Sequence, residues 1–295
     1  MNTRNFPMAP VLMTALAALA WGVWWIPVRY LASQGMTGTQ AGMMLNLGGA
    51  LAVFGLMISM RLSFRMPRYA FLGAIAVGFA LSFYSIGLAL SDVVRVILLF
   101  YLAPAWSKVI EWLFMGHKWR WSSTLTVTAS LTGALLILGG RLTTDGLNIG
   151  DILALLSGLA WAIGAALIFS GEKSTAYSLT LVTMAMATII AAAFALIIGE
   201  AAVPSAPALP LLGGLAIGAL YAMPCMFASL WSAQRLAPAL LSFLFTLEIF
   251  SGVISGALLL DEAFGVTQMM GAVLIVGAAL SEVYFAARAR TEEPA

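Results

Sequence analysis

Three residues in one apolar stretch carry chemistry that a hydrocarbon environment makes costly. Residues 95–112 read RVILLFYLAPAWSKVIEW, with Pro104 in the middle and Lys108 and Glu111 near the end. Because residues three apart lie on one face of a helix, the two charges can meet. We interpret Lys108 and Glu111 either as functional residues, in a cytoplasmic gate or in contact with a charged group of the substrate, or as a structural ion pair.

Pro104 predicts a break in its helix. Proline removes one backbone hydrogen bond and frees a carbonyl group in the preceding turn. Within a membrane, that carbonyl must bond to a neighbour or to water in a cavity. Pro27 and Pro224 predict similar breaks in two other apolar segments. Such breaks border many transport pathways but also occur in ordinary membrane helices, so both interpretations stay open.

Glu248 is an acid in the apolar segment LFTLEIF, with no basic residue within one helical turn. A carboxyl group at that depth is either neutral or faces water or a ligand ammonium. In the internal repeat described below, Glu248 falls at the position that corresponds to Pro104. It could bind an amino group or a proton, or it could be a protonated group with a structural hydrogen bond.

Several aromatic residues lie deep enough in their segments to escape the belt at the membrane interface. An aromatic-lined cavity would suit apolar side chains and could hold an ammonium group by cation–π contact. For any single aromatic residue, core packing is the alternative explanation. The predicted substrate site comprises Trp21, Trp24, Tyr84, Tyr101, Trp161, Phe227 and Glu248.

The composition excludes a water-soluble domain. Of the 295 residues, 62% are hydrophobic and 9% are charged, whereas a typical soluble domain is about 25% charged. Apolar segments of about 20 residues, the length that crosses a hydrocarbon core, recur along the chain. The sequence predicts an all-α integral membrane protein with ten transmembrane helices. We expect them near 10–32, 40–60, 69–90, 93–114, 122–140, 149–170, 178–199, 209–231, 238–259 and 266–287.

An internal repeat organises these segments. Residues 72–78 read LGAIAVG and residues 212–218 read LGGLAIG, at an offset of 140. The same offset places Trp21 on Trp161, each preceded by alanine. A third match, GALLILG with GAVLIVG, has an offset of 138. Three matches in one order at nearly one offset predict a duplicated unit.

The duplication predicts two five-helix halves, residues 1–145 and 146–295. Because each half has an odd number of spans, the second half enters the membrane in the opposite orientation. Inverted repeats are typical of secondary transporters, which bind substrate at the repeat interface and alternate access by rocking. Basic residues concentrate in the connections on one side of this topology, which places both termini in the cytoplasm.

Motifs along nearly the whole chain resemble the drug/metabolite transporter superfamily, in its EamA-type branch. The matching motifs are Ala20-Trp21 and Ala160-Trp161 in the first helix of each half, Phe100-Tyr101-Leu102-x-Pro104 in the fourth helix, and Leu260-Asp261-Glu262 with Gln268-x-x-Gly271 near the end. Within this superfamily, the chain is most similar to YddG-type amino-acid exporters.

The resemblance implies a multi-pass protein of the bacterial inner membrane that exports neutral or aromatic amino acids, or related small metabolites, by alternating access. An exporter of drugs or other metabolites is the alternative, followed by a non-transporting multispan protein. The expected partners are the small-molecule substrate and the lipid bilayer, without nucleic acid, and a monomer is favoured while an oligomer stays open.

An enzyme is not expected. The sequence contains no G-x-x-x-x-G-K-[ST] run for a nucleotide. With one histidine and one cysteine, it also offers no recognisable metal site. Neither a cofactor nor a metal is therefore expected.

Overall fold

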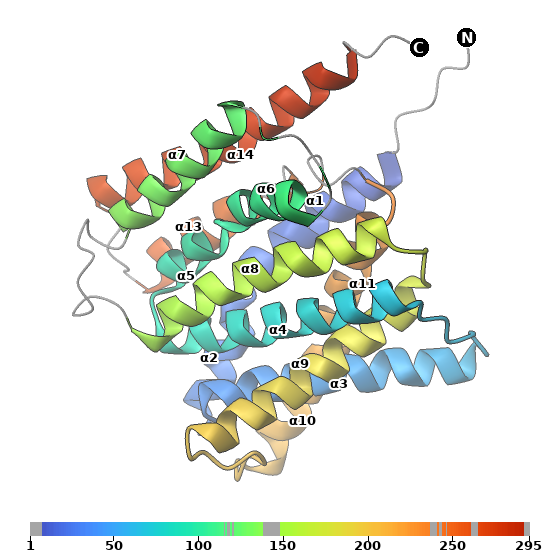
Figure 1. Cartoon of the computed structure of the whole chain (residues 1–295). Coiled ribbons are helices and arrows are strands. Elements are labelled where there is room, and N and C mark those ends of the chain that lie inside the picture. The colour runs from blue at the N-terminus through green and yellow to red at the C-terminus, as the bar shows by residue number, and fades with distance from the viewer. Residues whose placement is uncertain are drawn as a thin grey trace.

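The computed structural model describes residues 8–114, 116, 119, 121–137, 148–236, 241, 244–245, 247–260 and 265–291. These residues form a bundle of helices with no strand among them (Figure 1). The helices of the first half are α1 (Met8–Gly22), α2 (Trp25–Ser33), α3 (Gly38–Ser59), α4 (Arg68–Leu90), α5 (Val93–Phe100), α6 (Ala103–Phe114) and α7 (Trp121–Ile137). Those of the second half are α8 (Ile149–Ser170), α9 (Ala176–Ile197), α10 (Ala208–Ile217), the π-helix η2 (Gly218–Ala222), α11 (Met223–Ala233), α13 (Leu247–Leu260) and α14 (Val266–Thr291).

Seven described segments are long and apolar enough to cross a membrane. They are Met8–Ser33, Gly38–Ser59, Arg68–Leu90, Val93–Phe114, Ile149–Ser170, Ala176–Ile197 and Ala208–Ala233. The other three predicted segments contain α7, α13 and α14. The prediction of an all-helical, multi-span membrane protein is confirmed, and the count of ten spans stays a prediction.

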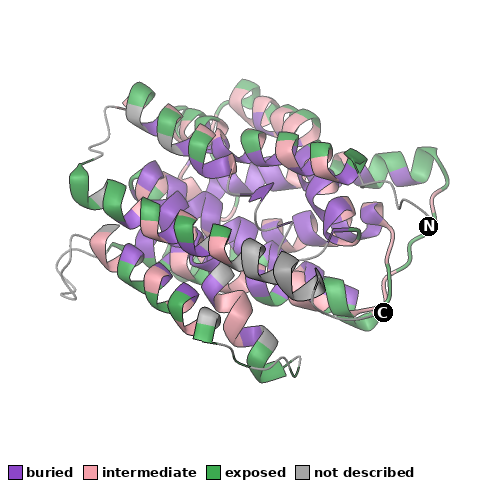
Figure 2. Cartoon of the chain, turned by 90° about the horizontal axis from the view of Figure 1, so that it is seen from above, coloured by how far each residue is buried: buried purple, intermediate pink, exposed green. Residues whose placement is uncertain are grey.

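The buried residues lie between the helices and the exposed residues on their outer faces (Figure 2). Many of the exposed residues are large and apolar. Leu16 and Leu220, for example, are 68% and 82% exposed. Exposing this apolar surface to water would be unfavourable, but the apolar lipid tails of a bilayer can cover it. The outer faces of the helices therefore suit a bilayer.

Three spans are interrupted shortly before a proline. The interruptions are the turn at Val23 and Trp24 before Pro27, the turn at Tyr101 and Leu102 before Pro104, and η2 before Pro224. A proline ring clashes with the carbonyl group four residues earlier, so the backbone departs from α-helical geometry at about that distance. Pro104 consequently lies in the first turn of α6, where its missing N–H has little cost, and it does not interrupt a continuous helix.

The contacts between helices repeat when the two halves are exchanged. The packing of α4 on α8 corresponds to that of α11 on α1, and the packing of α5 and α6 on α8 corresponds to that of α13 on α1. In two further pairs, α3–α9 and α7–α14, each helix packs against its own counterpart from the other half. These two pairs lie at opposite edges of the bundle (Figure 1). This exchange is what a pseudo-two-fold repeat requires.

Glycines permit equivalent close crossings in the two halves. A Cβ atom on Gly78 would lie 2.9 Å from the Thr183 carbonyl oxygen, and one on Gly218 would lie 2.0 Å from the Leu45 carbonyl oxygen. Gly78 and Gly218 are 140 residues apart, and Leu45 and Thr183 are 138 apart. Small residues at such crossings let membrane helices approach and gain dispersion contacts. The two halves thus share the close approach of helix backbones at these glycines as well as the sequence match.

Candidate functional site

A cavity lies between two groups of helices. The first bundle consists of α4, α5, α6 and α8, and the second bundle consists of α1, α11 and α13. The space between them measures about 1030 Å³, including the part that opens outward. Its described lining comes from predicted spans one, three, four, six, eight and nine. The aromatic members of the lining are Trp21, Tyr84, Phe100, Tyr101, Trp161, Phe169 and Phe245.

Glu248 lies in the first turn of α13 and is 3% exposed. The Tyr84 hydroxyl donates to its Oε1 at 2.6 Å, and the Tyr101 hydroxyl lies 3.0 Å from its Oε2. The Tyr101 hydroxyl also contacts the Phe245 carbonyl oxygen. Because Tyr84 and Tyr101 belong to the first bundle, these bonds cross the interface between the bundles.

The carboxylate of Glu248 faces an apolar and aromatic surface. None of the described residues that line the cavity is a lysine, an arginine or a histidine. A buried carboxylate is costly unless it is protonated, hydrogen-bonded or paired with a cation. The arrangement therefore suits a proton or the cationic group of a ligand.

Aromatic rings form a connected layer beside this carboxylate. The Phe100 ring lies 5.0 Å from Tyr84, 5.5 Å from Tyr101 and 6.3 Å from Trp161, between ring centroids. Trp161 in turn lies 5.5 Å from Phe245, with the rings at 77°. Tilted and edge-to-face pairs at these distances are favourable. The layer gives a ligand several ring faces and edges.

The break before Pro104 gives the Phe100 carbonyl group a special position. Because Pro104 has no N–H, this carbonyl cannot accept the usual hydrogen bond from four residues later. The backbone of α8 approaches it at Gly158, where a Cβ atom would lie 2.6 Å from the Phe100 oxygen. Gly158 therefore lets α8 pack tightly against the broken span.

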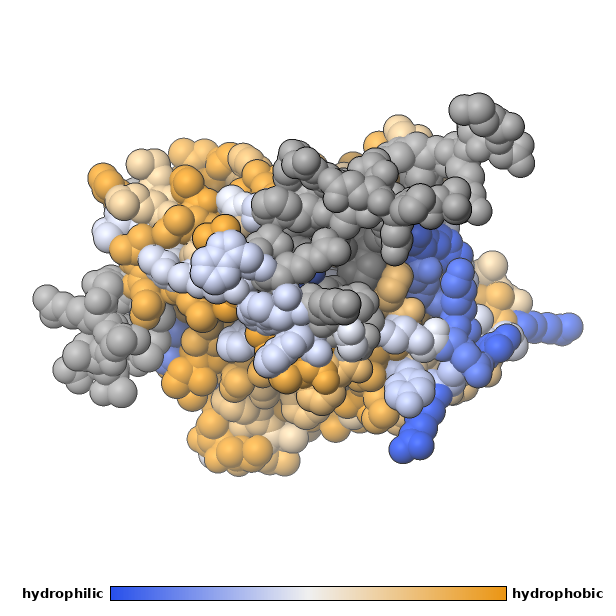
Figure 3. Space-filling view, turned by 45° about the horizontal axis from the view of Figure 1, so that its top comes forward, coloured by the Kyte–Doolittle hydropathy of each residue, from blue (hydrophilic) through white to orange (hydrophobic). Residues whose placement is uncertain are grey.

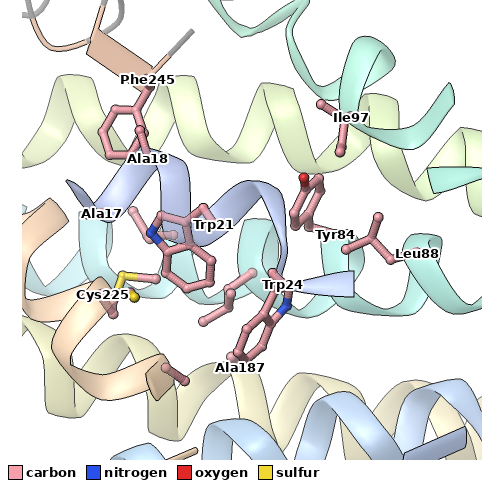
Figure 4. Close-up of a cluster of buried hydrophobic side chains, with 14 of the residues drawn as sticks. Ala17, Ala18, Trp21, Trp24, Tyr84, Leu88, Ile97, Ala187, Cys225 and Phe245 are labelled. Atoms are coloured by element: carbon pink, nitrogen blue, oxygen red, sulfur yellow. The ribbon is translucent and has the colours of Figure 1, made fainter. Parts of the chain in front are cut away.

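Trp21 and Trp24 lie side by side but face different surroundings (Figure 4). Trp21 lines the cavity and donates from Nε1 to Ser229 Oγ at 3.0 Å. Trp24 is fully buried, donates to Ser85 Oγ at 2.9 Å and stacks on Tyr221. Trp24 is outside the cavity lining, because the turn at Val23 and Trp24 redirects it.

Phe227 also lies outside the cavity lining, with its ring 4.7 Å from that of Tyr177. Five predicted site residues are brought together at the cavity, namely Trp21, Tyr84, Tyr101, Trp161 and Glu248. The lining also contains Phe100, Met226, Phe245 and three alanines of α8, which the sequence reasoning missed. The alanines lie at helical spacing next to Trp161, and that spacing could have indicated them.

Lys108 is half-buried on α6, one residue after Ser107, which lines the cavity. The side chains of Glu111 and Pro104 lie outside the described residues. The choice between a gate and an ion pair for Lys108 and Glu111 therefore stays a prediction.

A polar cluster lies at the end of the bundle where α8 begins; its members are Arg29, Ser91, Arg95 and Asp151. Asp151 is fully buried, with its Oδ2 2.8 Å from Arg95 Nη2, and it accepts from Ser91 Oγ at 2.7 Å. Arg29 donates to the Ser91 carbonyl at 2.8 Å and to the Leu88 carbonyl at 3.1 Å. These contacts join α2, α4, α5 and α8.

The cavity extends toward the other end of the bundle. Its lining on α8 runs from Trp161 to Phe169, in the half of the helix away from Asp151. Exposed basic residues lie near that end, and hydrophilic residues gather on one side of an otherwise largely apolar surface (Figure 3). The exposed basic residues are Arg61, Arg65, Arg68, Lys173 and Arg235. The α8 part of the cavity lining and these exposed basic residues therefore lie toward the same end of the molecule.

The model of the EamA-like transporter family matches residues 8–139 and again residues 148–281. The chain belongs to the EamA-like transporter family. Its two matches cover the helices that build the cavity from both halves. The predictions of a multi-pass membrane transporter and of the EamA branch are thereby confirmed.

The fold of this EamA-like transporter occurs in solved structures. One, titled "Crystal structure of protein", superimposes with a TM-score of 0.63 at 16% sequence identity, over 98% of this chain and 100% of the other. The likeness shows the fold alone. No curated protein matches the chain.

Proposed function

We propose that this EamA-like transporter exports neutral or aromatic amino acids, or related small metabolites, by alternating access. The observation that carries the proposal is the buried Glu248 carboxylate beside a layer of aromatic rings. An ammonium group would offset the charge of Glu248, and an apolar side chain would contact the rings. Trp21, Tyr84, Tyr101 and Trp161 complete the proposed substrate site.

The arrangement of the bundles supports alternating access. The first and second bundles correspond to one another in the repeat, and the cavity lies between them. In inverted-repeat transporters, one repeat or bundle rocks against the other around a fixed site. The bonds from Tyr84 and Tyr101 to Glu248 couple the site to both bundles, so ligand binding can influence their relative position.

The distribution of charge supports an orientation in the membrane. The end toward which the cavity extends carries the exposed Arg61, Arg65, Arg68 and Lys173. By the positive-inside rule, we propose that this end faces the cytoplasm, with both termini on that side of a bacterial inner membrane. A cavity open to the cytoplasm would load substrate for export.

An amine without a carboxylate is the second candidate substrate, in keeping with export of drugs or other metabolites. The described lining residues include no cation that could pair with a carboxylate, and this favours an amine that has none.

An amino acid would need a partner for its own carboxylate. Ser107 and the N-terminal turn of α6 border the cavity, and helix dipoles favour negative charge at such a terminus.

Efflux from liposomes tests the proposal and separates the two candidates. Purified protein would be reconstituted with tryptophan, tryptamine, phenylalanine or phenethylamine inside, and release would be timed with and without a proton gradient. Saturable release of tryptophan and phenylalanine supports the amino-acid exporter, and release of the amines alone supports the second candidate. No release above empty liposomes of any of the four, from folded protein, contradicts the proposal. A response to the gradient would identify proton coupling.

A further inference from the structure

We propose that an alanine face on α8 sets the size of the substrate that the cavity accepts, an inference that rests on the proposed function. Ala162, Ala165 and Ala166 all line the cavity. Their spacing of three and four residues places them on one side of the helix. Methyl groups leave more room on this side than any larger side chain would.

The corresponding span of the first half is filled at the same level. At an offset of 140, Trp25 and Ile26 correspond to Ala165 and Ala166. Trp25 is buried and donates from Nε1 to Ser255 Oγ of α13 at 2.9 Å. The room beside α8 therefore accompanies small side chains on a continuous helix, whereas the first half has a turn at Val23 and Trp24 and a buried Trp25 at the corresponding level.

The alanine face shares its cavity with the groups that would contact a bound substrate. Glu248 and the rings of Tyr84 and Phe100 contribute other parts of the same lining. A substrate whose ammonium group meets Glu248 would direct its side chain toward α8. Because side chains in a packed site exclude one another, each methylene added on α8 removes room for the substrate. We infer that bulky aromatic side chains are the class that this face accommodates.

Substitution of the alanines tests the inference. Ala165→Leu and Ala166→Leu should each lower tryptophan efflux roughly tenfold, while efflux of alanine is retained. Ala193→Leu is the matched control, since Ala193 is exposed on α9, and it should leave both rates unchanged. The measured quantity is the ratio of tryptophan to alanine efflux in liposomes.

An unchanged ratio in folded Ala165→Leu and Ala166→Leu protein overturns the inference, whether both rates fall or neither does. If a leucine variant fails to fold, Ala165→Val and Ala166→Val provide the same ratio with a smaller change. If the unsubstituted protein exports no amino acid, the proposed function fails first. The two failures are therefore distinguishable.

A different observation carries a second inference, that Arg29 closes the end of the cavity opposite its opening. Arg29 is on α2, which continues the span of α1, whereas its acceptors Leu88 and Ser91 lie at the end of α4. Its bonds therefore run from the span of the second bundle to the first bundle. A cation on the carbonyl groups of a helix C-terminus is favoured by the helix dipole.

Further hydrogen bonds and an ion pair hold the end of α4, which supplies the carbonyl groups that accept from Arg29. Ser91 donates to Asp151 of α8, and Asp151 is paired with Arg95 of α5. Asn148 also donates to Ser91 Oγ at 2.9 Å. These bonds hold the end of α4 in place, so Arg29 meets a fixed pair of carbonyl groups.

The other end lacks an equivalent donor at the repeated position. At an offset of 140, Phe169 corresponds to Arg29. Phe169 lines the cavity and is 44% exposed. A phenyl ring has no N–H to donate across the bundles. In the proposed function, opening this end would separate α2 from the end of α4 and so break the bonds from Arg29 to Leu88 and Ser91.

Thiol labelling measures closure without relying on transport. In a Cys225→Ala background, Ile97→Cys reports on the closed end, because Ile97 is fully buried between α5 and α13, near Gly252. Ala166→Cys reports on the open end. We expect Arg29→Gln to raise maleimide labelling at Ile97→Cys roughly tenfold and to lower labelling at Ala166→Cys.

Arg235→Gln is the matched control, because Arg235 donates to a carbonyl of its own helix segment, at Trp231. It should change neither labelling rate. If Arg29→Gln raises both rates, the substitution has loosened the fold, and if it changes neither, Arg29 is not the closing contact; either result overturns the inference. Arg29→Lys, with a point charge in place of the guanidinium fork, should give a smaller shift in the same direction.

Discussion

The first span of each half offers a direct comparison within one molecule. In the first half, the span is broken at Val23 and Trp24, and Trp25 fills the space beside α13. In the second half, α8 is continuous and carries Ala165 at the corresponding position, beside the cavity. The backbones pack against equivalent neighbours. The difference teaches that a duplicated fold can build a one-sided cavity through a local break in one copy and small side chains in the other.

We expect substitution of Glu248 to have the largest effect, because Glu248 is the one acidic residue among the described residues that line the cavity. Glu248→Gln should reduce transport of an ammonium-containing substrate by about 10- to 100-fold, since a charged hydrogen-bond partner is lost. Uptake of labelled substrate into liposomes, with protein amount matched, measures the effect.

Glu172→Gln is the control, because Glu172 is exposed and its ion pair with Arg65, at 3.7 Å, is exposed as well. Exposed pairs of this kind contribute little. Equal activity of Glu248→Gln and Glu172→Gln would remove the case for a carboxylate at the centre of the site.

Trp161 should give the next largest effect. Trp161→Ala removes the ring that contacts both Phe100 and Phe245, and we expect transport to fall about tenfold as ring contacts are lost. Trp119→Ala should retain activity, because Trp119 lies away from the cavity lining, beside Trp112. Initial rates at equal expression test the pair, and similar rates in both variants would contradict an aromatic site in the second half.

The glycine crossings give the smallest expected effect, on stability instead of transport. Gly218→Ala places a Cβ atom 2.0 Å from the Leu45 carbonyl oxygen, whereas Gly213→Ala meets nothing within 4 Å. Overpacking of this kind costs about 1–3 kcal/mol. The melting temperature of Gly218→Ala should therefore fall below that of Gly213→Ala in detergent. The reverse order would show that the repeated crossing is not tightly packed.

The sequence could predict how far along a membrane segment a residue lies. It could not predict toward which neighbouring helix the side chain of that residue points. Apolar length and the repeat placed Trp21, Trp161 and Glu248 near the middle of their predicted segments. In the structure all three line one cavity, although Glu248 lies in the first turn of α13. Trp24 has nearly the same depth as Trp21, but the turn beside it points the side chain toward Ser85. Hydropathy carries no information about such a rotation, because all sides of these helices are apolar.

Contacts between distant segments were also beyond the sequence. The bonds from Tyr84 and Tyr101 to Glu248 join residues 164 and 147 positions apart. The role of Arg29 depends on where α2 meets the end of α4, which the turn after α1 determines. The alanines of α8 could not be recognised as site residues by their chemistry, because a methyl group neither forms hydrogen bonds nor carries charge. Their importance depends on the cavity that they line.

The Tyr101 hydroxyl has one proton and two neighbours that can accept it, the Phe245 carbonyl and the Glu248 carboxylate. It can serve only one of them fully at a time. If the cation of a substrate binds Glu248, as we propose, the Tyr101 hydroxyl is left to donate to the Phe245 carbonyl, which precedes α13. In the proposed function, the acceptor of the Tyr101 proton would therefore differ between the empty and the occupied site, and this difference would reach the backbone of the second bundle.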